Sequence, residues 1–127
     1  MAREGHAKDG LALMRQSSTE RLALGVTWYQ ILYMCMLAES YLQHERTDEG
    51  LAAIAEAKEL VARADEHIWE AELNRIDGEL QRLQGASPDK LECLFQKALA
   101  IARNQSAKSF ELRASMSLAR FWRDQQL

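Results

Sequence analysis

Apolar side chains recur along most of the chain at three- and four-residue steps, which is the period of an amphipathic α-helix. Between residues 51 and 61, for example, Leu51, Ile54, Ala57 and Val61 share one side of such a helix. No segment shows a convincing alternation of apolar and polar residues, as a half-buried β-strand would. The pattern therefore predicts an all-α fold.

Residues that start or stop helices divide this pattern into segments. Ser87, Pro88 and Asp89 are typical of an N-cap, a first-turn proline and a first-turn acid. Thr47, which two acidic residues follow, is expected to cap another helix, and Gly85 is expected to end one. The six predicted helices span about residues 3–17, 21–45, 48–65, 68–84, 88–104 and 107–125.

Similar segments return at a nearly constant spacing. DGLALM (9–14) aligns with EGLAAI (49–54), and KLECLF (90–95) follows after almost the same interval. LAESY (37–41) returns as LARFW (118–122), two such intervals later. Such self-similarity predicts an α-solenoid of antiparallel helix pairs in one domain, residues 1–127. Its predicted parts are the second helix of a truncated repeat (3–17), repeats over 21–65 and 68–104, and a terminal helix (107–125).

The most apolar stretch is WYQILYMCMLA, residues 28–38, in which only Gln30 is polar. It is shorter than the roughly 18 to 20 residues that cross a bilayer, so we do not expect a membrane span. It also carries more large apolar residues than one buried helix face needs. We therefore expect exposed apolar surface at Trp28, Leu32 and Met36, which is available for a second copy of the chain or for a missing upstream repeat.

Two interleaved sets of residues carry a resemblance to a known family: Met34, Leu37, Ala38 and Tyr41, then Gly50, Ile54 and Ala57, then Leu118, Ala119 and Trp122. In these positions the chain resembles the tetratricopeptide (TPR) repeat. It departs from that pattern at Asp77 and Gln81, and its period of about 40 residues exceeds the usual 34. The resemblance implies that small residues allow close helix packing and that the first helix of each pair lines a concave peptide-binding face.

The positions of this chain that match the concave face carry mostly charged side chains. They are Glu39, Gln43, Glu72, Arg75, Glu79, Arg82, Arg113, Met116, Arg120 and Arg123. An acidic or mixed-charge peptide could lie across them, with Arg113, Arg120 and Arg123 as partners for carboxylates. The alternative is a set of salt bridges between helices, such as Glu72 or Glu79 with an arginine of the last helix.

A second resemblance runs through most of the chain's second half, from EGLAAIAEA (49–57) through WEAELNRIDGEL (69–80) to KALAIARNQSAKSFELRASMSLARFWRDQ (97–125). These segments are similar to the C-terminal helical repeats of bacterial signalling proteins that combine an adenylate/guanylate cyclase or DNA-binding domain with an ATPase. The resemblance implies a regulatory repeat tail.

Charge and composition narrow the classes of function. The net charge is −3, and no run of basic residues suggests binding to nucleic acid. His67 with Glu66 and Glu70 lacks the spacing of a zinc motif, so we expect no metal site and no cofactor. We also expect no catalytic residue and no small-molecule substrate, because no nucleophile has an evident base. Cys35 and Cys93 are expected to be reduced core thiols of a cytoplasmic protein.

The sequence thus predicts a non-catalytic interaction or scaffold module that binds a protein or peptide on its concave face. The alternative function is homo-oligomerisation, in which exposed apolar helix faces form a homodimer.

Overall fold

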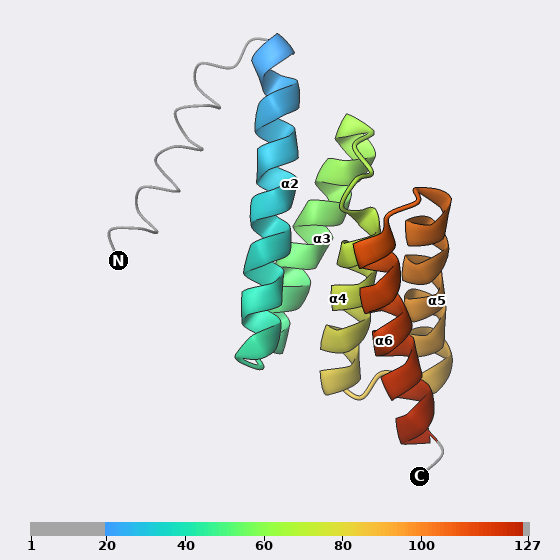
Figure 1. The fold of residues 1–127 in the computed structure, drawn as a ribbon. Coiled ribbons are helices and arrows are strands. Elements are labelled where there is room, and N and C mark those ends of the chain that lie inside the picture. The colour runs from blue at the N-terminus through green and yellow to red at the C-terminus, as the bar shows by residue number, and fades with distance from the viewer. Residues whose placement is uncertain (1–19, 126–127) are drawn as a thin grey trace.

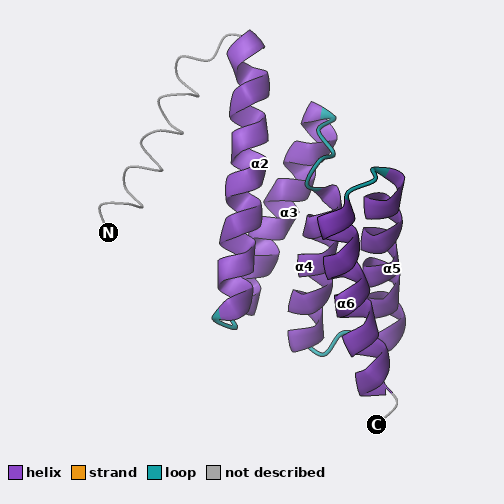
Figure 2. Ribbon diagram, viewed as in Figure 1, coloured by secondary structure: helices purple, strands orange, loops and turns teal. Residues whose placement is uncertain are grey.

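The computed structural model describes residues 20–125, and it describes side chains from residue 27 onward. These residues form five α-helices and no β-strand (Figure 2). They are α2 (Glu20–Gln43), α3 (Thr47–Ala64), α4 (Glu70–Leu83), α5 (Pro88–Asn104) and α6 (Lys108–Gln125). The all-α prediction is confirmed for this part of the chain, whereas the helix predicted over residues 3–17 lies outside it.

Consecutive helices run in opposite directions, so that α2, α4 and α6 point one way and α3 and α5 the other (Figure 1). The helix α4 lies in the middle and contacts all four others. Its residues 71–80 are all buried. Within the described helices, none is long and apolar enough to span a bilayer.

The local signals set most helix ends as predicted. The hydroxyl of Ser87 accepts a hydrogen bond from the backbone N–H of Lys90, and Pro88 opens α5. Gly85 follows α4 with a φ of +78°, a conformation that favours glycine. The prediction for Thr47 was wrong: Arg46 occupies the N-cap, without a capping side-chain bond, and Thr47 is the first helical residue. Arg46 pairs with Glu49 instead.

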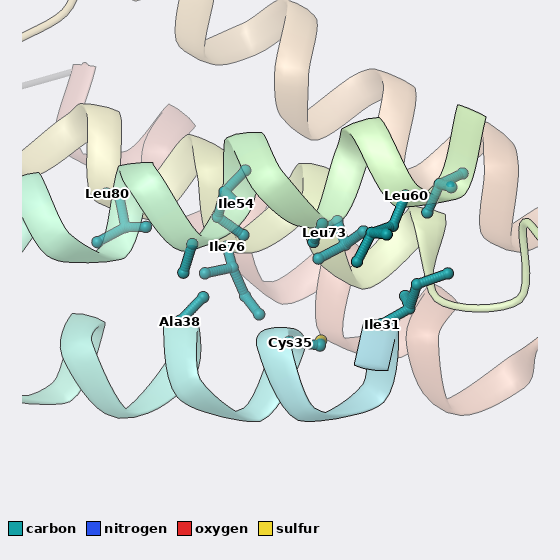
Figure 3. Packing of buried hydrophobic residues seen from close by; sticks show 11 residues of the cluster. Ile31, Cys35, Ala38, Ile54, Leu60, Leu73, Ile76 and Leu80 are labelled. Atoms are coloured by element: carbon teal, nitrogen blue, oxygen red, sulfur yellow. The ribbon is translucent and has the colours of Figure 1, made fainter. Parts of the chain in front are cut away.

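The core has two parts. The first joins α2, α3 and α4 through residues such as Ile31, Ala38, Ile54 and Leu73 (Figure 3). The second lies between α5 and α6, where Phe95 and Phe121 meet with ring centroids 5.9 Å apart. Glycine allows α4 to approach this second part closely, because a Cβ on Gly78 would lie 2.6 Å from the Phe95 ring.

The repeat alignment misplaced the packing face of the last helix. It assigned Leu118, Ala119 and Trp122 to the core, but Ala119 is exposed and Trp122 is 45% exposed. Leu118 and Phe121 are the buried pair. One residue turns a helix by about 100°, so Trp122 lies outside the buried core that Phe121 enters, and its Nε1 donates a hydrogen bond to exposed Glu92 of α5 at 3.4 Å.

The prediction for the cysteines was half right. Cys35 is buried in the core, but Cys93 is exposed on α5. Since Cys93 neighbours Glu92 and both are exposed, it lies on the solvent side of an amphipathic helix.

Candidate binding groove

A groove with a volume of about 290 Å³ lies between α2, α4 and α6. These are the helices whose polar rows were predicted to line one face. Side chains from all three helices line it: Leu32, Cys35, Met36, Glu39, Ser40, Gln43, Trp69, Glu72, Ile76, Phe110 and Arg113. The groove therefore combines an apolar part with a polar part.

The apolar part begins with a column of aromatic rings. Trp28, Trp69 and Phe110 come from α2, from the residue before α4 and from α6, and their centroids are 5.9 and 5.8 Å apart. Leu32 and Met36 continue this wall along α2. Leu32 is half-buried, whereas Met36 is 63% exposed. Met36 is therefore the apolar side chain of this wall that a binding partner can reach most readily.

The polar part is a closed ring of two acids and two arginines. Arg75 of α4 lies 2.9 Å from Glu72 and 3.0 Å from Glu39 of α2. Arg113 of α6 lies 2.7 Å from the other oxygen of Glu39 and 3.1 Å from Glu72. Each charge in the ring thus has two partners of opposite sign, and the ring connects α2, α4 and α6.

The α4 members of the ring, Glu72 and Arg75, are buried, whereas Glu39 and Arg113 are 28% and 46% exposed. The side chains of Glu72 and Arg75 are only 5% and 7% exposed. Burial lowers the pKa of Arg75, but hydrogen bonds to Glu72 and the negative charges of Glu72, Glu39 and Glu79 outweigh it, so the pKa is raised overall. Arg75 is thus held as a cation at the buried end of the ring.

A second polar cluster connects α4 and α6 beyond the groove. Glu79 accepts hydrogen bonds from the Ser117 hydroxyl at 2.9 Å and from Arg120 at 3.1 Å. Arg82 lies 3.0 Å from Asp124. The predicted salt bridges between helices, Glu72 or Glu79 with an arginine of the last helix, are therefore present.

The structure brings most of the predicted concave-face residues together. Glu39, Gln43, Glu72 and Arg113 line the groove, and Arg75 lies in the ring beneath it. Glu79, Arg82 and Arg120 lie in the second cluster. Met116 is 54% exposed and does not line the groove. Arg123 is exposed, with its Nε 3.7 Å from Asp124.

Ser40, which lines the groove, was not predicted from the sequence. Four further residues of this face, Trp69, Phe110, Ile76 and Ser117, were not predicted either. A signal for them existed, because Trp28, Trp69 and Phe110 follow one another at equal intervals along the chain. The same interval relates Cys35, Ile76 and Ser117. Aromatic side chains at the repeat spacing would have placed the column of rings.

The thiol at the base of the groove is not poised for nucleophilic chemistry. Burial, and then the carboxylates of Glu72 and Glu39, raise the pKa of the Cys35 thiol to about 12. The thiolate is the nucleophilic form, so Cys35 behaves as an apolar core residue at neutral pH. Within residues 27–125, no group of His, Cys, Asp and Glu side chains is arranged to hold a metal ion.

His67 lies in the connection between α3 and α4 and joins two carboxylates. Its Nε2 is 2.6 Å from Asp65 and its Nδ1 is 3.1 Å from Glu70. These hydrogen bonds, first to Asp65 and then to Glu70, raise the pKa of His67 above its ordinary value. The backbone carbonyl of His67 also accepts a hydrogen bond from Gln105, which links this connection to the one after α5.

We expect this connection to make stability depend on pH. A raised pKa in the folded state means that the contribution of His67 is fully present below about pH 6.5, its unfolded pKa, and is lost as the pH rises through the folded pKa. Replacing His67 with glutamine should make the urea midpoint of unfolding depend less on pH between about pH 6 and pH 8. A His67→Gln variant whose urea midpoint varies with pH as much as that of the unmodified chain would refute the assignment.

Comparison of the chain with protein-family models, curated proteins and solved structures finds no match. The proposed function therefore rests on the geometry and chemistry of the groove.

Proposed function

We propose that the chain is a non-catalytic protein-interaction module, an α-solenoid of TPR-like repeats whose groove binds a peptide or helix of a partner protein. The observation that carries this proposal is the groove between α2, α4 and α6, which holds an exposed methionine beside a fixed ring of charges. A signalling protein in the cytoplasm is the setting that the sequence resemblance suggests.

The repeat spacing supports the solenoid part of the proposal. Side chains separated by one repeat interval contact one another across the helices, as Glu72 does with Arg113 and Glu79 with Arg120. Equivalent positions of consecutive repeats meet in this way when repeats stack by a constant translation. The groove then corresponds to the surface shared by the first helix of each repeat.

The chemistry of the groove supports binding rather than catalysis. Its carboxylates are engaged by arginines, and its thiol has a pKa of about 12. Its volume of about 290 Å³ lies at the lower end of small-molecule pockets and suits one or two anchoring side chains of a polypeptide. Full burial of a methionine side chain contributes about 1.5 to 3 kcal/mol, which makes Met36 a strong contact for such an anchor.

The proposal predicts that binding depends on Met36. Peptides selected from a random library against the full chain should bind the Met36→Gln variant about tenfold more weakly, because an apolar contact is lost. The matched control is Leu112→Gln on α6, where the side chain is 61% exposed and does not line the groove. Failure to select any peptide, or peptides that are indifferent to Met36→Gln, would contradict the proposal.

Self-association is a second candidate function, because Tyr29 and Met36 of α2 are 54% and 63% exposed. Large exposed apolar side chains on one helix are typical of surfaces that pair with another protein. The same variants separate the two functions: a dimer that dissociates in Met36→Gln, seen by light scattering, would favour pairing of copies. A monomer at every concentration would exclude it.

A further inference from the structure

The acids and the arginines of this face are buried to different depths. The side chains of Glu72 and Glu79 are 5% and 10% exposed. Their partners on α6, Arg113 and Arg120, are 46% and 49% exposed. In these two pairs the guanidinium group is the more exposed partner, so an approaching molecule meets the positive side of each. The Arg75–Glu39 pair is the reverse, with side chains 7% and 28% exposed.

The two walls of the face also differ in character. The wall formed by α2 presents Leu32 and Met36 beside the uncharged Ser40 and Gln43, and its one charged lining residue, Glu39, is paired with Arg75 and Arg113. On the α6 side, Arg113 lines the groove, and Arg120 follows two helical turns later on the same helix, beyond the groove lining. Arg123 extends this row by almost one turn and is 71% exposed.

The row of arginines keeps hydrogen-bond donors for a ligand. Arg120 contacts Glu79 and Ser117 through one terminal nitrogen only, which leaves the rest of its five-donor guanidinium without a partner in residues 27–125. The nearest carboxylate to Arg123, that of Asp124, is 3.7 Å away and is also bound by Arg82 at 3.0 Å. Arginine binds carboxylates through paired N–H groups, so acidic side chains are the natural partners of this row.

The geometry favours a helix over an extended peptide. The groove is walled by side chains of three helices, whose backbone groups are already bonded within each helix, so an extended peptide would find few partners for its own backbone. A helix satisfies its backbone internally and offers side chains in rows. Arg113 and Arg120 lie two turns apart, about 10.5 Å along the axis, and side chains two turns apart on a partner helix have the same spacing.

We infer that the partner is an acidic amphipathic helix, which lies with its apolar side in the groove on Met36 and extends past the groove along α6, where its carboxylates meet Arg120 and Arg123. This inference rests on the proposed function and adds the chemistry and orientation of the partner. Basic helices are disfavoured because the acids of this face are already bonded. Glu72 and Glu79 are also buried, while Glu39, 28% exposed, is paired with Arg75 and Arg113, and Asp124, 43% exposed, is paired with Arg82.

Two designed peptides of about 18 residues, long enough to form a helix, test the inference. They share the same leucine and alanine positions, and one carries glutamates where the other carries lysines. The full chain should bind the glutamate peptide at least about tenfold more tightly at low salt, with a preference that shrinks as salt is added. The double variant Arg120→Glu with Arg123→Glu should reverse the preference.

Two controls make the outcomes distinct. Arg63→Glu on α3 reverses a charge that is 67% exposed and lies outside the groove, so it should leave the preference unchanged. Met36→Gln should weaken binding of the peptide that binds better. If both peptides bind equally well and Met36→Gln weakens both, the inferred preference for an acidic helix is wrong, but the proposal that the groove binds a partner is retained. If neither peptide binds, or if Met36→Gln has no effect, the proposal that the groove is a binding site is refuted.

Discussion

Replacing Arg75 with methionine is expected to lower the free energy of unfolding by about 3 kcal/mol, because it leaves Glu72 and Glu39 with one cation between them. Arg75 bonds to both acids, and Glu72 is only 5% exposed. Breaking a buried ion pair from one side typically costs about 3 to 5 kcal/mol. The lower end applies here, since Arg113 still contacts both carboxylates. Urea unfolding monitored by circular dichroism should show a lower midpoint at an unchanged slope.

A second substitution separates the lost ion pair from the lost packing. In the Arg75→Met background, Glu72→Gln removes the uncompensated charge and should recover part of the stability. The exposed arginine of α3 gives the control, since Arg63→Met should change stability by less than about 0.5 kcal/mol. Equal effects of Arg75→Met and Arg63→Met would show that the ring does not hold α2, α4 and α6 together.

The helices could be predicted from sequence because their signals are local. Predicted and observed α5 coincide at residues 88–104, where serine, proline and aspartate start the helix in immediate succession. The agreement is weaker at α4, which was predicted from residue 68 and begins at Glu70. There Ile68 and Trp69 continue the apolar pattern into the connection, and Trp69 packs on Phe110 rather than within the helix.

The groove could be predicted only in outline. The resemblance to TPR repeats placed Glu39, Glu72 and Arg113 on one face, but the ring they form depends on distances between helices that a repeat pattern does not contain. Depth was the other missing quantity. Glu79 and Arg120 occupy equivalent repeat positions, and the sequence does not distinguish how deeply they lie. In the structure, the side chain of Glu79 is 10% exposed and that of Arg120 is 49% exposed. Depth determines which charge a partner meets.

Replacing Phe95 with alanine should be about as damaging as the loss of Arg75, with a cost of about 3 to 5 kcal/mol. Phe95 is fully buried, packs on Phe121 and fills the space beside Gly78. Its removal leaves a cavity between α4, α5 and α6, which the surrounding helices close only in part. Thermal or urea unfolding measures the loss, and an effect below about 1 kcal/mol would contradict the packing described for these helices.

Whether Gly78→Ala stabilises or destabilises the protein depends on the aromatic ring of Phe95. In the unmodified chain, Gly78→Ala brings a Cβ to 2.6 Å from Phe95, and overpacking of about 1 to 3 kcal/mol should exceed the roughly 1 kcal/mol by which alanine favours a helix. In a Phe95→Leu background the ring is gone, so the same Gly78→Ala change should stabilise the protein. A double-mutant cycle measures this coupling. Additive effects would mean that the ring moves aside freely, and that close packing of α4 on α5 does not require glycine at position 78.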